Sequence, residues 1–333
     1  MGQDGASQGG VRIDRRGFVA GALSLPIVGT APLHAASRLP PEPLRRAIAD
    51  ARDFARSDAA QIWPGFARAP FQLLLVGDES EHLFYSGGPA SGFSQTFPDP
   101  VTGGPVKSRR RRHARNLLST FPAVDGIPTV VVGHPDATAR PSIADWTIML
   151  LHEHFHQLQY STAGYQKRIE ALNLSSGDVT GRWMLDFPFP YADGAVAAQA
   201  RLSASVLARA IAHRDRARLV DYLAARDTLR DHAGVRNWRY FAFQCYQEGV
   251  ARHAEIQLAA NSPRDDWQAA ATRLRQQTLA VLRDFNLTGD KRVGIYAYGA
   301  GEALLLDRWM PGWEQRYLNQ PMSLDALFDA LRA

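Results

Sequence analysis

The sequence predicts an α+β protein that is mostly α-helical, with a small N-terminal sheet and a helical part after it. Two patterns predict this class. Short apolar runs next to Gly and Pro, typical of strands, occur before about residue 140. Apolar residues at helical spacing dominate the chain from about residue 195 onward. We therefore expect one domain over 37–333, strand-bearing over about 37–140 and helical over about 141–333.

Composition sets limits on this domain. The chain has 333 residues, of which 45% are hydrophobic and 21% are charged, so wholesale disorder is excluded. One cysteine cannot form an intrachain disulfide or a cysteine-based metal site. A net charge of +5 is too small and too mixed to indicate nucleic-acid binding.

The first 36 residues have the pattern of an export signal. Arg15 and Arg16 are adjacent, a weakly apolar stretch covers 18–30, and small residues follow at 35–37. This order resembles a twin-arginine signal peptide, which implies the twin-arginine export machinery as a partner and a periplasmic or secreted protein. The stretch is too short and broken for a permanent membrane span. The alternative is a disordered or membrane-anchoring N-terminus.

The strand-bearing part begins with a helix. Residues 42–58 carry apolar side chains at helical spacing. Residues 71–76 and 82–85 are short apolar runs that predict an antiparallel pair, and residues 127–132 predict another strand. Residues 86–108 are rich in Gly, Pro and Ser and predict a loop.

A basic run covers residues 107–115, with four consecutive arginines at Arg109–Arg112. We interpret it as a solvated loop or helix face. The alternative is a contact surface for an acidic partner.

The helical part starts at Ser142, which is placed to cap a helix over 142–160. An irregular stretch follows residue 173, and its apolar loop over 183–191 either walls a substrate cleft or covers the core. Further helices are predicted at 195–212, 215–231, 237–260, 265–284, 295–309 and 323–332.

A metal-binding motif lies on the helix over 142–160. His152 and His156 are one turn apart, offset by about 40°, so both imidazoles can reach one ion. Glu153 flanks the same face, whereas His154 points about 200° away from His152. Apolar neighbours predict a buried helix, and burying these groups together is unfavourable unless something pairs them. The alternative is a pair of hydrogen-bonded core histidines.

Zinc would need a third protein ligand, and Glu170 and Glu248 are the candidates. Glu248 precedes Gly249 inside an apolar helix, where a glycine indicates close backbone approach. We expect that approach to be against the motif helix. Arg252 and Glu255 follow on roughly the same face and could orient the ligands. The alternative is a surface Glu248 paired with Arg252.

His152-Glu153-x-x-His156 on one helix, with Glu248-Gly249-x-Ala251 on a later helix, resembles the gluzincin metallopeptidases. The resemblance implies a zincin-like fold with the metal site between the sheet and the helical part. It also implies that His152, His156 and Glu248 hold zinc and that Glu153 is the general base. Two tyrosines and two glycines open a helix at 295–302, a segment similar to one in some metallopeptidase-like proteins. Its Tyr296 is the candidate donor to the oxyanion, with aromatic core packing as the alternative.

Together these patterns predict an exported zinc-dependent hydrolase. We expect one zinc ion per chain, a peptide or protein substrate, zinc-activated water and Glu153 as base. Two alternatives stay open: a catalytically inactive zincin-like binding protein, and a metal-dependent hydrolase of non-peptide substrates. A His₂Glu site also accepts metals other than zinc.

Overall fold

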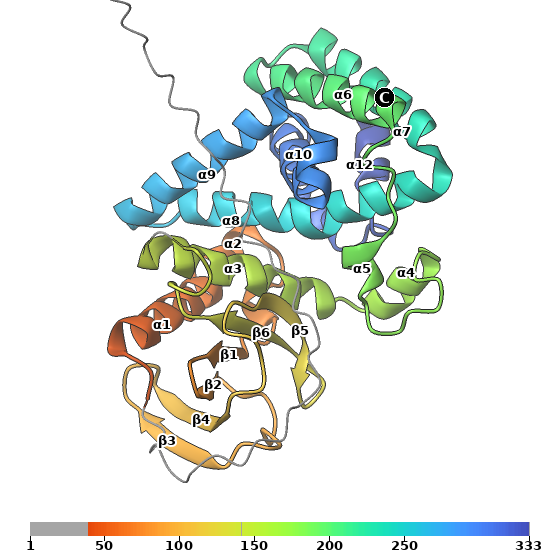
Figure 1. Ribbon diagram of the computed structural model, residues 1–333. Coiled ribbons are helices and arrows are strands. Elements are labelled where there is room, and N and C mark those ends of the chain that lie inside the picture. Colours follow the sequence, from red (N-terminus) through yellow and green to blue (C-terminus); the bar gives the residue numbers. More distant parts are fainter. Residues whose placement is uncertain (1–38, 141, 333) are drawn as a thin grey trace, which may run out of the picture.

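A computed structural model describes residues 39–140 and 142–332 of the chain. It is an α+β structure, mostly helical, with one six-stranded sheet, as the sequence predicts (Figure 1). The proposed signal peptide over 1–36 lies outside the described residues.

The N-terminal part contains all six strands of the described chain and the helices that precede them. The helices are α1 (Glu42–Arg56), α2 (Ala59–Ile62) and a 3₁₀ turn, η1 (Phe66–Arg68). The strands are β1 (Leu73–Val76), β2 (Ser80–Phe84), β3 (Gln95–Asp99), β4 (Gly104–Arg110), β5 (Leu118–Val124) and β6 (Ile127–Gly133). Helix α1, the β1–β2 pair and β6 confirm the predictions for these segments.

The sheet has the strand order β3-β4-β2-β1-β6-β5. Strands β1 and β6 are parallel, with Leu73 opposite Val130, and the other neighbours are antiparallel. Side chains alternate across the pleat, so Leu73 and Leu75 join the main core while Leu74 and Val76 join a smaller one on the opposite face. Strand β1 is therefore buried on both faces.

The prediction of a loop over residues 86–108 is wrong. It contains β3 and most of β4, which pair with each other and, through β4, with β2. Pro98 and the surrounding polar residues hide the strand pattern, and they are tolerated because β3 lies at an edge of the sheet. Strand β5 was not predicted either, because its sequence lacks a clear apolar alternation.

The basic run was predicted to be a solvated loop or helix face, and this prediction is wrong at Arg109. Arg109 lies in β4, is buried, and its Nε donates a 2.9 Å hydrogen bond to Glu81 Oε2 on β2. Its guanidinium also stacks over the ring of Phe93. Cross-strand pairing with a buried carboxylate, which the local pattern does not reveal, places Arg109 inside; Arg110–Arg112 are exposed.

The helical part begins with α3 (Ile143–Tyr160), capped as predicted by Ser142, whose Oγ accepts from the N–H of Asp145. The later helices are α4 (Tyr165–Ala171), α5 (Trp183–Asp186), α6 (Gly194–Ala212), α7 (Arg216–Gln244), a π-helical turn η2 (Cys245–Gly249), α8 (Val250–Ala260), α9 (Asp265–Arg283), α10 (Leu287–Trp309), α11 (Glu314–Tyr317) and α12 (Asp325–Ala330).

Three boundaries differ from the predictions. Helix α7 runs through the predicted break with a kink at Gly234, whose φ of 74° a glycine adopts without a Cβ clash. The predicted α-helix over 237–260 contains the π-turn η2. Helix α10 begins earlier than residue 295 and is interrupted at Lys291, so Tyr296 lies within the helix instead of opening it.

Helix α3 connects the two parts of the fold (Figure 1). It packs against α1, β5 and β6 of the N-terminal part and against α8 and α9 of the helical part. No helix in the described part of the chain combines the length and apolar character needed to cross a membrane.

Candidate metal centre

Helix α3, which carries His152, Glu153 and His156, is buried from its first turn almost to its end. Ile148, Leu150, Leu151 and Phe155 are fully buried, which fixes the rotation of the helix. His152 and His156 are consequently held on the face toward α8 and η2, with little solvent exposure.

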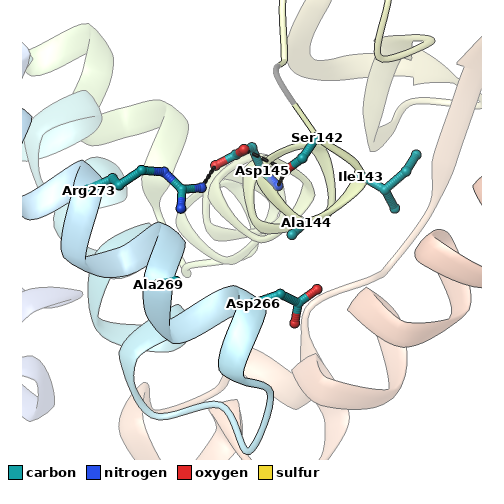
Figure 2. A pocket seen from close by; sticks show the side chains of 7 residues that line it. All are labelled: Ser142, Ile143, Ala144, Asp145, Asp266, Ala269 and Arg273. Carbon is teal, nitrogen blue, oxygen red and sulfur yellow. Dashed lines mark hydrogen bonds and ion pairs between the residues drawn. The ribbon is translucent and has the colours of Figure 1, made fainter.

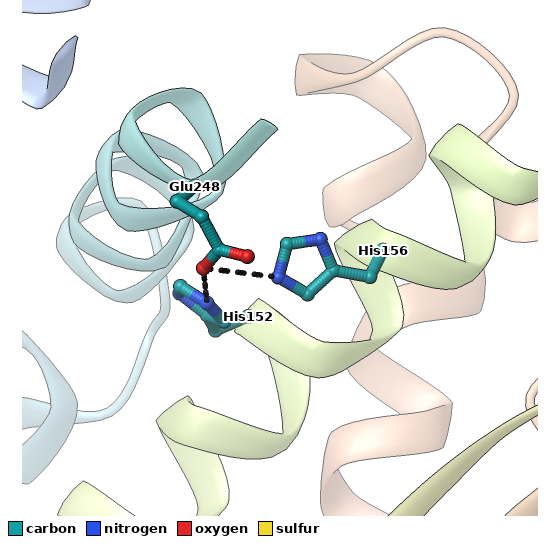
Figure 3. A group of neighbouring side chains, drawn as sticks. All are labelled: His152, His156 and Glu248. Carbon is teal, nitrogen blue, oxygen red and sulfur yellow. Dashed lines mark ion pairs between the residues drawn. The ribbon is translucent and has the colours of Figure 1, made fainter. Parts of the chain in front are cut away.

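The structure brings His152, His156 and Glu248 together (Figure 3). Glu248 Oε2, on η2, lies 3.7 Å from His156 Nε2 and 4.0 Å from His152 Nε2. The three candidate ligand atoms all lie within 4.8 Å of one another. Ligand atoms around a tetrahedral zinc ion are about 3.3 Å apart, so binding of an ion would draw the three side chains closer together. The Glu248 side chain is 23% exposed, which leaves the centre open on one side.

An amide chain orients the His156 imidazole. Gln159 Nε2 donates to the carbonyl oxygen of Gln247 at 2.9 Å and to the hydroxyl of Tyr317 at 2.6 Å, so Gln159 Oε1 must face the other way. That oxygen lies 2.7 Å from His156 Nδ1 and accepts its proton. The lone pair of neutral His156 is therefore on Nε2, which faces Glu248.

A carboxylate supports His152 from the far side of its ring. Glu255 Oε2 on α8 lies 3.5 Å from His152 Nδ1 and 3.5 Å from Arg252 Nη1. Burial would raise the pKa of Glu255, but Arg252 and His152 outweigh it and lower the pKa to about 2. His152 Nδ1 and Glu255 Oε1 are buried without a hydrogen bond. No hydrogen bond at Nδ1 therefore opposes a small movement of the His152 ring.

Opposite charges couple His156 and Glu248. Burial would lower the pKa of His156, but the Glu248 carboxylate raises it to about 9. Burial would likewise raise the pKa of Glu248, yet contact with His156 lowers it to about 2. Without an ion the pair is a salt bridge at neutral pH, and a metal would bind by displacing the proton.

Glu153 is next to the centre without belonging to it. Its side chain is buried, and Oε2 accepts a 2.8 Å hydrogen bond from the hydroxyl of Thr120 on β5. The same hydroxyl lies 2.9 Å from the backbone carbonyl of Glu153. Sequence reasoning missed Thr120, since a lone threonine in an unpredicted strand carries no local signal.

The other candidates from the sequence lie elsewhere. Glu170 is exposed on α4, where it accepts from Gln166, and it does not join the histidines. His154 faces the opposite side of α3, between Gln157 Oε1 at 2.7 Å and the carbonyl of Phe66 at 3.2 Å, and burial lowers its pKa to about 4.

The glycine beside Glu248 approaches a different helix from the one expected. A Cβ on Gly249 would meet the Cα of Gly299 at 2.5 Å, so the close contact is with α10, not α3. Gly299 in turn packs on the backbone of Cys245. The glycine at position 249 correctly indicated a close contact between two backbones, but the sequence did not show which helix makes that contact.

Two tyrosines lie near the centre. Tyr296 on α10 is buried, and its hydroxyl oxygen accepts from Arg292 Nη1 at 2.6 Å. Tyr160 ends α3, one turn after His156, and burial together with the charges of Glu248 and Glu153 raises its pKa to about 12. Its four-residue spacing from His156 is the sequence signal that would have found it.

A hollow of about 630 Å³ at the first turn of α3 is a separate feature (Figure 2). Asp145 there accepts from Ser142 Oγ at 2.6 Å and from Arg273 Nη2 at 2.9 Å. Its main charged groups thus neutralise each other, and none of its lining residues belongs to the metal centre.

Comparison of the chain with protein families, with curated proteins and with solved structures found no match. The function is therefore argued from the geometry of the centre.

Proposed function

We propose that the protein is an exported zinc-dependent hydrolase of the gluzincin type that cleaves peptides. The observation that carries this proposal is the convergence of His152, His156 and Glu248 from two separate helices. Export rests on the twin-arginine pattern of residues 1–36 alone.

The three side chains suit one zinc ion per chain. Two imidazole nitrogens and one carboxylate oxygen form a donor set typical of catalytic zinc, which keeps a fourth position for water. The partners Gln159 and Glu255 on the outer nitrogens are the kind that orient zinc-binding histidines. When bound, the ion would supply Lewis acidity and make water a stronger acid.

Glu153 is the group that would move the proton. It adjoins the ligands in sequence and on the helix surface, and Thr120 holds its carboxylate. Glu153 would accept the proton of a water molecule that attacks the substrate carbonyl, and would return it to the leaving amine. The hydroxyl groups of Tyr296 and Tyr160 are the candidates to donate to the oxyanion that forms on that carbonyl.

The position of β5 favours a peptide as substrate. Strand β5 is an edge strand and pairs only with β6 among the described strands. Its contact with Glu153 through Thr120 places this edge beside the centre. A free edge offers backbone N–H and C=O groups with which an extended peptide can pair, whereas small esters and amides cannot use it.

Replacing the proposed base tests this function. We expect Glu153→Gln to keep the bound metal and to lose activity about 10²–10⁴-fold, because the amide cannot accept the proton. Cleavage of a peptide library by the zinc-loaded protein, followed by mass spectrometry, measures activity, and elemental analysis measures the metal. Glu170→Gln is the matched control.

Equal activity of the two variants and the wild type would reject the assignment of Glu153. Bound zinc with cleavage of esters or simple amides, but of no peptide, would instead indicate a hydrolase of other substrates. Bound zinc without hydrolysis of any of these compounds would indicate a binding protein.

A further inference from the structure

Tyr317 is a buried tyrosine on α11 that contacts the elements carrying the candidate metal ligands. Its side chain has no solvent exposure, and its ring stacks on that of Tyr246, on η2, with the ring centroids 4.4 Å apart. The Tyr317 hydroxyl lies 2.6 Å from Gln159 Nε2 on α3 and 2.7 Å from the carbonyl oxygen of Tyr246. One hydroxyl group therefore joins α3, which carries the two histidines, to η2, which carries the glutamate.

The Tyr246 carbonyl fixes the direction of the Tyr317 hydroxyl. A carbonyl oxygen can only accept a hydrogen bond, so Tyr317 donates its proton to Tyr246. The hydroxyl oxygen of Tyr317 is then an acceptor, and the group that faces it has to be a donor. Gln159 accordingly turns its Nε2 toward Tyr317, and the carbonyl oxygen of Gln247, 2.9 Å from the same nitrogen, requires the same orientation.

This direction is passed on to the imidazole of His156. Because Nε2 of Gln159 is engaged, Oε1 is the atom that lies 2.7 Å from His156 Nδ1 and accepts its proton. His156 Nε2, 3.7 Å from Glu248 Oε2, then carries the lone pair that a metal ion needs. The one competing contact is from Gln247 Nε2, at a longer 3.3 Å from His156 Nδ1. The Gln247 amide can turn its oxygen there instead, since its other partner, the Tyr165 hydroxyl, can donate or accept.

We propose that Tyr317 is a positioning residue of the metal centre, which acts through Gln159 to hold His156 in the tautomer that binds zinc. This inference rests on the zinc site of the proposed function and not on its substrate. Without the Tyr317 hydroxyl, one N–H of Gln159 loses its acceptor, and only the Gln247 carbonyl opposes rotation of the amide. A rotated amide presents an N–H to His156 Nδ1 and moves the imidazole proton to the nitrogen that faces Glu248.

Two isosteric variants test this role through zinc affinity. We expect Tyr317→Phe, which keeps the ring and its stacking, to weaken zinc binding about 10-fold, as for other residues that orient metal ligands. Tyr222→Phe is the matched control and should leave the zinc Kd unchanged, because its buried hydroxyl donates to Glu302 at 2.7 Å, outside the centre. Competition with a chelator measures the zinc Kd, and denaturant unfolding measures the stability of each variant.

A double-mutant cycle shows whether Tyr317 acts through Gln159. Gln159→Met removes the amide with little change of shape, and we expect it to weaken zinc binding at least as much as Tyr317→Phe does. In the Gln159→Met background, Tyr317→Phe should add no more than about a 2-fold loss, because the chain of hydrogen bonds is already broken. NMR of the zinc-bound protein gives a second readout: the Nδ1 proton of His156 should exchange slowly with water in the wild type and faster in Tyr317→Phe.

Wild-type zinc affinity in Tyr317→Phe, or an equal loss of affinity in Tyr222→Phe, would overturn the inference. So would the same loss from Tyr317→Phe with and without Gln159, or a wild type that binds no zinc. Zinc binding that depends on Tyr317 through Gln159, in a protein that hydrolyses no peptide, ester or amide, would support the inference while rejecting the proposed hydrolase.

Discussion

The tautomer of His156 is set by residues outside the group of His152, His156 and Glu248. Gln159 can present only its oxygen to the imidazole because its nitrogen donates to Gln247 and Tyr317. This orientation places the lone pair of His156 on the nitrogen that faces Glu248. The candidate metal centre is thus arranged by hydrogen bonds as well as by the spacing of His152 and His156.

Thr120 provides a prediction at this scale. Thr120→Val keeps the shape of the side chain but removes the hydroxyl that donates to Glu153, so the carboxylate loses its orientation. We expect kcat to fall about 10-fold, as for the loss of a hydrogen bond to a charged group, with unchanged zinc content. Steady-state kinetics and elemental analysis measure both. Thr96→Val, an exposed change on β3, is the control; an unaltered kcat in Thr120→Val would rule out this role.

The sequence predicted which side chains meet at the candidate centre better than it predicted their surroundings. His152, Glu153 and His156 follow from helical periodicity, and Glu248 was chosen because of the glycine after it. Thr120 could not be found this way, because it reaches Glu153 through tertiary packing of β5 against α3. Tyr160 could have been found from its spacing.

At the scale of elements, the contact between η2 and α10 holds Glu248 in place. Gly249 and Gly299 allow the two backbones to touch, and the π-turn η2 carries the ligand. Turns of this kind often occur at functional sites, where they redirect side chains. The local sequence does not distinguish a π-turn from an α-helix, which is why the uniform helix predicted over 237–260 was wrong.

Adding one methyl group tests this contact. Gly249→Ala would place a Cβ 2.5 Å from the Cα of Gly299 and push η2 away from α10. We expect the free energy of unfolding to fall by about 1–3 kcal/mol and zinc affinity to weaken, because Glu248 moves with η2. Gly194→Ala is the control, since a Cβ there meets no atom within 4 Å. Denaturant unfolding and zinc titration measure the two effects, and wild-type values in Gly249→Ala would exclude the contact as a constraint.

At the scale of the whole molecule, α3 is shared by the sheet and the helical part, and the candidate ligands come from α3 and from η2 in the helical part. The sequence predicted this arrangement coarsely: the class, the β1–β2 pair, β6 and the main helices. It missed β3, β4 and β5, because strands rich in Pro and polar residues are defined by their partners; β3 and β5 are also the edge strands.

The buried carboxylate of Glu81, on β2, makes the stability of the fold depend on pH in the acid range. Burial would raise its pKa, but contacts with His113, the N–H of Arg112 and Arg109 lower it from 4.5 to about 2. A lowered pKa in the folded state stabilises the protein above pH 4.5, and this stabilisation is lost as the pH falls toward 2.

We therefore expect Glu81→Gln to lose about 3 kcal/mol of unfolding free energy at pH 7, the order given by such a shift. The difference from the wild type should shrink between pH 4.5 and pH 2. Urea unfolding across this range measures it, with the exposed Glu79→Gln as control. A difference independent of pH would mean that charge at Glu81 does not contribute.

The zinc content of the purified, zinc-dialysed protein tests the central claim most directly. We predict one zinc ion per chain in the wild type and in Glu170→Ala, and a large loss in Glu248→Ala, because only Glu248 faces both histidines. A wild type that binds no zinc, or a Glu248→Ala variant that keeps its full zinc content, would contradict the account.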